Sequence, residues 1–173
     1  MQSSKTDRIL KALIGGLLVV LVAVVADTLR ERVIGVGDTA PDFEIQTDSG
    51  LVVSRSNFGG KVLVLNFWAT WCPPCIEEIP SLNAFHQKLK DEGVVVLGIS
   101  VDEDEGAYRR FLEGHKVQFL TARDPAAEIS SRYGTYRYPE TYIIDSSGKV
   151  RQKIIGAADW TDERMINYVR SLL

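Results

Sequence analysis

Residues 62–80 read VLVLNFWATWCPPCIEEIP, an apolar segment that leads into the only two cysteines of the chain. Its first seven residues, 62–68, form an apolar run rich in β-branched side chains. Such a run is typical of a strand buried on both faces, which occurs in parallel or mixed sheets covered by helices. A helix is predicted from Pro74 to Asp91, because apolar residues recur there at helical spacing.

The rest of the chain continues this alternation of strands and helices. Strands are predicted as a hairpin at 43–47 and 51–54, then at 94–101 and 117–121, and finally as a C-terminal hairpin that begins at 141. Helices are predicted at 104–114, at 125–133 and after Thr161, which we expect to cap the last helix. The pattern predicts an α/β protein with a central mixed β-sheet flanked by helices.

The N-terminus is predicted to be membrane-directed. Residues 12–26 read ALIGGLLVVLVAVVA, without a charge, and follow Lys5, Arg8 and Lys11. With Ile9 and Leu10 the apolar helix is about 27 Å long, close to the roughly 30 Å of a hydrocarbon core. We expect residues 1–26 to be a transmembrane signal anchor, 27–36 a tether and 37–173 the folded domain. Cleavage before Asp27, which gives a secreted protein, stays an alternative.

Charge restricts the partners of the exported part. From residue 27 onward, 17 basic residues stand against 22 acidic residues, a net charge of −5. Nucleic acid is therefore an unsuitable partner. The basic residues before the apolar run place the N-terminus inside and the domain outside, so we expect a cell-membrane protein with an extracytoplasmic domain.

The only two cysteines, Cys72 and Cys75, can form a structural disulfide, a metal-binding site or a redox-active pair. A structural disulfide is disfavoured because closing so small a loop removes little entropy from the unfolded chain. Zinc needs four ligands, and His86 and His115, the only histidines, lie in separate segments. A copper-carrying site with two thiolates and one imidazole stays an alternative.

The redox interpretation has the position of the cysteines in its favour. The predicted strand ends near Trp68, so Cys72 falls at the start of the next helix, where free N–H groups and the helix dipole favour a thiolate. Only a thiolate attacks a disulfide. Cys75 lies one helical turn further on, where it can displace the mixed disulfide that Cys72 forms. Pro73 and Pro74 fit a first turn that needs no N–H partners.

Three motifs together carry a family resemblance over roughly residues 35–172. They are FWATWCPPC (67–75), followed five residues later by Pro80, VGDTAPDF (36–43) upstream and YPETYIIDSSGK (138–149) downstream. With an extra strand and helix between 103 and 133, the chain resembles the TlpA/ResA branch of membrane-anchored thiol-disulfide oxidoreductases. That resemblance implies a thioredoxin-like fold with an N-terminal β-hairpin and a central strand–helix insert.

The resemblance also implies roles for individual residues. Cys72 matches the attacking cysteine and Cys75 the buried resolving one. Pro139 matches a proline whose preceding peptide bond is cis, in a turn that packs against the disulfide. The backbone of Tyr138 is then expected to pair with the partner's backbone as a short strand. Trp71 is expected to form the rim of the site, so Trp71, Tyr138 and Pro139 are the predicted substrate-binding residues.

One position departs from thioredoxin, which carries a buried aspartate where this chain has Asn66. Asparagine does not accept the proton that Cys75 must lose. Glu78 follows Cys75 by three residues, on the same side of the helix, and relatives often have a glutamate there. Burial beside the thiols is expected to raise its pKa and suit it to acid–base work. Glu78 is the third predicted catalytic residue.

The predicted function is a thiol-disulfide oxidoreductase that reduces disulfides in client proteins, with cytochrome c maturation as one role. The resemblance implies that a transmembrane electron donor re-reduces the Cys72–Cys75 disulfide. No organic cofactor or metal is required, because the two thiols carry both electrons. A thiol peroxidase of the same superfamily is a further alternative, but it needs a threonine where this chain has Ala69. The acidic run at 102–105 is expected to be a solvated loop and helix start.

Overall fold

The computed structural model describes residues 3–28 and 33–173, which form two units. The first unit, within residues 1–32, contains helix α1 (Ser3–Thr28). Its apolar side chains are exposed wherever they are described, at 10, 13–14, 17–22 and 24–25. No helix meets the length and apolarity criteria for a membrane span within the described residues. Residues 29–32 of the predicted tether lie outside those residues.

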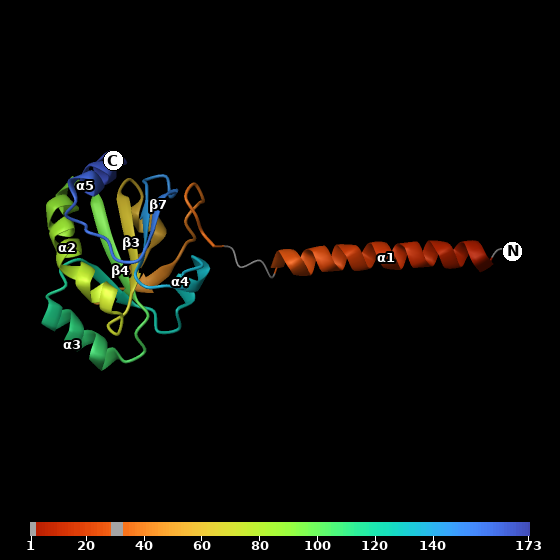
Figure 1. The fold of residues 1–173 in the computed structure, drawn as a ribbon, viewed down its shortest axis with the longest axis horizontal. Coiled ribbons are helices and arrows are strands. Elements are labelled where there is room, and N and C mark those ends of the chain that lie inside the picture. The colour runs from red at the N-terminus through yellow and green to blue at the C-terminus, as the bar shows by residue number, and fades with distance from the viewer. Residues whose placement is uncertain (1–2, 29–32) are drawn as a thin grey trace. The chain divides into compact units, whose positions relative to one another are not determined.

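The second unit, residues 33–173, is built on a five-stranded mixed sheet of order β5-β4-β3-β6-β7 (Figure 1). Strand β3 (Val62–Trp68) runs parallel to β4 (Val94–Ser100), which is parallel to β5 (Leu120–Arg123). On its other side β3 is antiparallel to β6 (Glu140–Ile144), and β6 is antiparallel to β7 (Val150–Ile155). The central position of β3 explains its apolar run, because all seven of its residues are buried.

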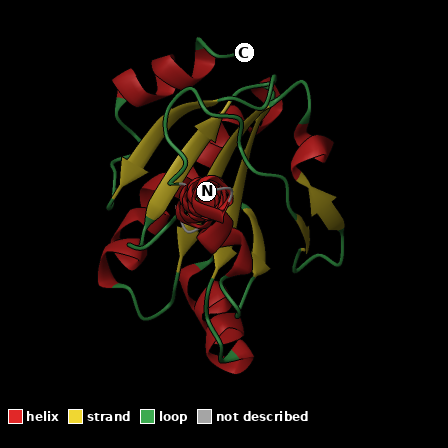
Figure 2. Ribbon diagram, turned by 90° about the vertical axis from the view of Figure 1, so that its right-hand side faces the viewer, coloured by secondary structure: helices red, strands yellow, loops and turns green. Residues whose placement is uncertain are grey.

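Helices cover both faces of the sheet (Figure 2). Helices α2 (Pro73–Leu89) and α5 (Glu163–Arg170) bury Leu82, Phe85 and Ile166 against one face. The other face packs against α4 (Glu128–Arg132), the 3-10 helix η1 (Arg55–Phe58) and the hairpin of β1 (Glu44–Gln46) and β2 (Val52–Ser54). Helix α3 (Glu105–His115) buries Tyr108 beside the start of α2, and a second 3-10 helix, η2 (Lys90–Glu92), leads into β4.

Several predicted boundaries need correction. The predicted strand at 117–121 is displaced to 120–123, because the N–H of Val117 still closes the end of α3 on Leu112 O. The cap of α5 is Asp162, not Thr161: its side chain accepts from the N–H of Arg164, whereas Thr161 bonds to Asp159. The mixed sheet, the hairpin and the order of the elements are as the sequence predicts.

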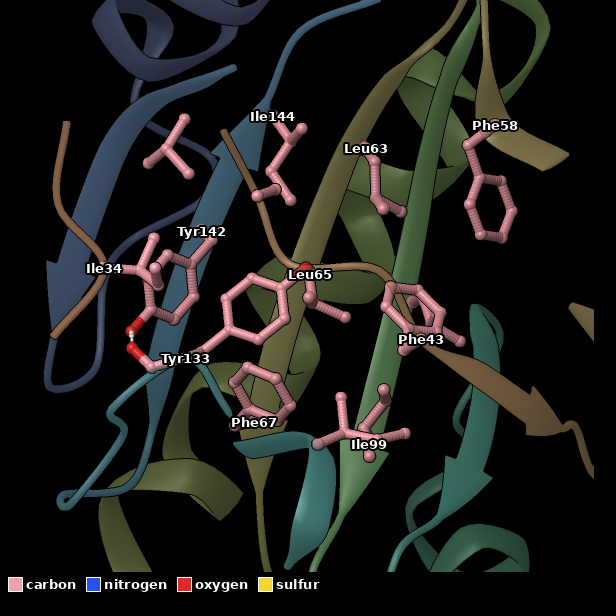
Figure 3. Packing of buried hydrophobic residues seen from close by; sticks show 14 of the residues in the cluster. Ile34, Phe43, Phe58, Leu63, Leu65, Phe67, Ile99, Tyr133, Tyr142 and Ile144 are labelled. Carbon is pink, nitrogen blue, oxygen red and sulfur yellow. Dashed lines mark hydrogen bonds between the residues drawn. The ribbon is translucent and has the colours of Figure 1, made fainter. Parts of the chain in front are cut away.

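The predicted tether includes part of the core. Ile34 is buried among Tyr133, Tyr142 and their neighbours (Figure 3). Its N–H donates to Tyr133 O at 3.1 Å, and its carbonyl accepts from Lys153 Nζ at 3.3 Å. The compact unit therefore begins at Val33, four residues before the predicted start at Gly37.

Candidate redox site

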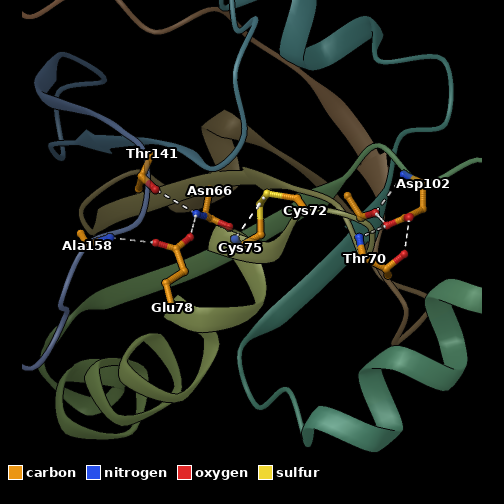
Figure 4. Close-up of a disulfide and its surroundings, with 9 residues drawn as sticks. Asn66, Thr70, Cys72, Cys75, Glu78, Asp102, Thr141 and Ala158 are labelled. Carbon is orange, nitrogen blue, oxygen red and sulfur yellow. Dashed lines mark hydrogen bonds between the residues drawn. A yellow bond between two sulfur atoms is a disulfide. The ribbon is translucent and has the colours of Figure 1, made fainter.

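The two cysteines lie where β3 passes into α2, and they form a disulfide (Figure 4). Cys72 is the N-cap of α2, and its sulfur accepts the N–H of Cys75 at 3.3 Å. Pro73 and Pro74 occupy the first positions of the helix, where no N–H partner is needed. A thiolate at position 72 would meet the positive end of the helix dipole, as expected from the sequence. Cys72 is 5% exposed and Cys75 only 1%.

Glu78 lies one turn after Cys75 and is 3% exposed. Its Oε1 accepts from Asn66 Nδ2 at 2.8 Å, and its Oε2 accepts from the Ala158 N–H at 3.3 Å and from Trp160 Nε1 at 3.2 Å. Burial raises the pKa of this carboxyl above its ordinary value, and the three hydrogen bonds partly offset the rise. The structure thus places a buried carboxylate of raised pKa one helical turn after Cys75.

Asn66 links this carboxylate to the strand that follows the proline turn. Its Nδ2 also donates to Thr141 Oγ1 at 2.9 Å, from β3 to β6. Figure 4 shows Asn66, Glu78 and Thr141 together on the Cys75 side of the disulfide. Thr141 and Trp160 were missed by sequence reasoning, since only long-range packing brings Thr141 to Asn66 and Trp160 to Glu78.

The proline turn lies beside the cysteines. The Tyr138–Pro139 peptide bond is cis, as the resemblance implies, and Pro139 is buried. Tyr138 is half-buried and packs against the cluster that contains both cysteines. The Trp71 ring is 64% exposed and meets the Tyr138 ring edge-on, with 6.0 Å between centroids. Trp71 and Tyr138 therefore form an aromatic rim beside the cluster that contains the disulfide, and Pro139 follows Tyr138 in the chain.

A second buried carboxylate fixes the loop before Cys72. Asp102 accepts from the backbone N–H of Thr70 at 2.9 Å and from its hydroxyl at 2.6 Å, and Ser100 Oγ also donates to it. The expectation of a solvated loop at 102–105 is therefore wrong for Asp102, which is buried because these donors surround it. Asp104 does cap α3, through the N–H of Ala107.

The residues of the alternative functions lie elsewhere or lack the required group. His86 is half-buried in α2, where burial lowers its pKa, whereas His115 stacks on Phe111 in α3. Among the described residues, no group of three His, Cys, Asp or Glu side chains is placed to hold a metal ion. Ala69, where a thiol peroxidase needs a threonine, is buried and offers no hydroxyl.

Comparison with known proteins agrees with this geometry. Residues 36–153 match the model of the AhpC/TSA family. The thiol-disulfide oxidoreductase ResA of Bacillus thuringiensis subsp. konkukian is 33% identical over 174 residues, which cover 97% of this chain and 98% of that protein. The chain belongs to the ResA family of thiol-disulfide oxidoreductases. ResA of Geobacillus kaustophilus is 32% identical over 161 residues, covering 89% of this chain and 92% of that protein.

Solved structures place the ResA-family domain in a wider group. The crystal structure of a Chlorobium tepidum protein described as a thiol:disulfide interchange protein DsbE superimposes with a TM-score of 0.73 at 32% identity. The match covers 79% of this chain and 99% of that one. A Chlorobium tepidum protein of the thioredoxin family matches with a TM-score of 0.69 at 26% identity, over 79% and 99% of the two chains. The thioredoxin-like α/β fold is confirmed.

Proposed function

We propose that this chain reduces disulfides in client proteins through the Cys72–Cys75 pair. The observation that carries the proposal is the arrangement around the start of α2. One sulfur caps the helix, the other lies one turn further on, and a buried carboxylate of raised pKa follows after a further turn. This arrangement provides a nucleophile, a resolving thiol and a proton acceptor in sequence.

The reduced protein begins the reaction as a thiolate on Cys72 and a thiol on Cys75. The thiolate attacks one sulfur of a client disulfide, the client S–S bond breaks, and the released client sulfur takes a proton from solvent. Cys75 then gives its proton to Glu78 and attacks the Cys72 sulfur, which breaks the mixed disulfide. The second client sulfur leaves as a thiolate and takes a proton from solvent, and Glu78 releases its own proton to solvent. The client gains two electrons as two thiols, and the protein ends as the disulfide that the structure contains.

The rim supports a role in client binding. An extended client segment laid against the Tyr138–Pro139 turn would pair with backbone groups there, while Trp71 covers apolar side chains next to the client disulfide. The relatives' names state thiol-disulfide oxidoreduction and do not identify a client. Cytochrome c maturation is the client pathway that we propose for this chain.

A direct test measures the reduction potential of the cysteine pair together with insulin reduction. A protein reductant is expected near the potential of thioredoxin, about −270 mV, whereas a potential near −120 mV is typical of a strong oxidant. Cys75→Ser is expected to accumulate a mixed disulfide with a client peptide, and Cys72→Ser to form none. A potential near −120 mV would reverse the proposed direction, and loss of the mixed-disulfide asymmetry would remove the assigned roles.

We also propose that the domain works outside the cytoplasm, where the N-terminal segment holds it at the membrane. A membrane electron donor re-reduces its cysteine pair. The support is the sequence: an uncharged apolar run at 12–26 preceded by three basic residues. The full chain is expected in the membrane fraction. Protease added to intact spheroplasts is then expected to cut its domain. Leu17→Arg combined with Val20→Arg is the matched variant and should leave the domain protected inside. Protection of the unaltered chain would contradict the proposed location.

A further inference from the structure

The two oxygens of the Glu78 carboxylate have different partners. Oε2 accepts two N–H groups, those of Ala158 and the fully buried Trp160 ring, and neither group can act as an acceptor. Oε1 accepts one, from Asn66 Nδ2 at 2.8 Å. A proton that arrives on this carboxylate therefore settles on Oε1, where the partner is a side chain able to change its role.

The present orientation of Asn66 suits only the ionised carboxylate. If Oε1 carried a proton, its O–H would face the N–H of Asn66, donor against donor, in a site with little access to water: Asn66, Glu78 and Thr141 are all buried. An asparagine carries an oxygen acceptor opposite its NH2 donor, and the two groups are similar in size. A half-turn of the amide would place Oδ1 where Nδ2 now lies.

Thr141 fits both orientations. Its hydroxyl now accepts from Asn66 Nδ2 at 2.9 Å, and after the half-turn the same hydroxyl can donate to Oδ1. Oδ1 would then accept from both Glu78 and Thr141, as Nδ2 now donates to both. The other hydrogen-bond partners of the carboxylate among the described residues are neutral: the Ala158 N–H and the Trp160 ring, both from the loop before α5. Cys75 lies one turn earlier on the same helix as Glu78.

We propose that the Asn66 amide rotates by a half-turn each time Glu78 takes up or releases the proton of Cys75. The Thr141 hydroxyl changes at the same time between accepting from Asn66 and donating to it. This inference rests on the proposed function. In the resolving step the S–H bond of Cys75 breaks, an O–H bond forms at Glu78 Oε1, and the Cys75 thiolate is left to attack the Cys72 sulfur. Asn66 is then a positioning residue, because it gives each protonation state of Glu78 a complete set of hydrogen bonds.

The inference is tested by NMR on the oxidised full chain in detergent micelles, with labelled Asn, Glu and Thr. The chain has four asparagines, and the Asn66 signal is assigned by its loss in Asn66→Asp. At pH values above the Glu78 titration, the Asn66 NH2 is expected to show nuclear Overhauser contacts to the Thr141 methyl. These contacts should disappear on acidification with the same midpoint as the Glu78 carboxyl carbon shift.

Glu78→Gln makes the result independent of the accessible pH range. The glutamine oxygen is expected to face the N–H groups of Trp160 and Ala158, so its NH2 faces Asn66 and holds Asn66 in the turned orientation at every pH. Asn83 is the internal control. Its Nδ2 donates to Lys116 O and its Oδ1 accepts from the Gln118 N–H, so its orientation should not change.

The possible results distinguish a failure of the proposed amide rotation from a failure of the proposed disulfide reduction. Unchanged Asn66–Thr141 contacts in Glu78→Gln, or unchanged contacts while Glu78 titrates, would overturn the turning amide even if the protein reduces insulin. Failure to reduce insulin would instead overturn the proposed function, and the NMR result would still report the behaviour of the amide.

Discussion

Replacing Glu78 by Gln separates proton transfer from packing at this site. Glutamine keeps an oxygen acceptor for Trp160 and Ala158, so the fold should be retained. What is lost is the proposed acceptor for the Cys75 proton, and water replaces it poorly because Cys75 and Glu78 are at most 3% exposed. General bases contribute about 10²–10⁴-fold, so we expect resolution of the mixed disulfide to slow by about 100-fold or more at pH 7, roughly 2.7 kcal/mol in activation free energy.

The assay is stopped-flow oxidation of the reduced protein by a disulfide peptide between pH 5 and pH 10. In the Glu78→Gln variant the rate should rise about tenfold per pH unit, because Cys75 must then ionise without help. In the unaltered protein the rate should level off above the pKa of Glu78. Superimposable pH–rate profiles for the two proteins would refute the role of Glu78 as proton acceptor.

The same variant should change stability in a pH-dependent way. Burial raises the native pKa of Glu78 above its ordinary value, so the native state holds this proton more tightly than the unfolded state. The stability gained in this way is present at low pH and is lost as the pH rises through the native pKa. Glu78→Gln, which never ionises, should therefore have a higher Tm than the unaltered oxidised protein at pH 8 and a similar Tm near pH 4. A lower Tm at pH 8 would show that the hydrogen bonds outweigh burial.

Three further predictions concern the cysteines, the preceding loop and the rim. In the reduced protein, iodoacetamide should modify Cys72 at least about tenfold faster than Cys75 at pH 7, because Cys72 caps the helix, and equal rates by mass spectrometry would contradict this. Asp102→Ala should lower the free energy of unfolding by about 2–4 kcal/mol in urea, since buried donors of Thr70 lose their acceptor, whereas a loss below about 0.5 kcal/mol would refute the anchoring role. Trp71→Ala should raise KM for a client peptide about 3–10-fold with little change in kcat, as expected when uniform binding is lost, and a fall in kcat alone would place Trp71 in the chemical step.

The elements closest to the cysteines were the most predictable from sequence. Residues 62–68 form β3 with the predicted boundaries, because a strand buried on both faces leaves a continuous apolar run. The position of Cys72 at the start of the helix followed from local spacing alone. The choice of Glu78 needed its spacing to Cys75 together with the family resemblance.

What could not be predicted depends on contacts between distant segments. Nothing in the local sequence indicates that Trp160 donates to Glu78, since 82 positions separate them. Asp102 was expected to be solvated because it opens an acidic run, yet the end of β4 brings it against the Thr70 loop. Such polar contacts form only once the sheet order is set, and no periodicity in the sequence encodes them.

Ile34 has a practical consequence for how the domain can be separated from its N-terminal segment. A truncation that starts at Gly37 removes an isoleucine side chain from the face shared with Tyr133 and Tyr142, and deletes the carbonyl that Lys153 Nζ contacts. Loss of a buried isoleucine alone typically costs about 2–5 kcal/mol, a large part of the stability of a domain of this size. Soluble versions made for biochemistry should therefore retain Val33 and Ile34. Otherwise the low stability caused by the missing isoleucine will be mistaken for a property of the intact enzyme.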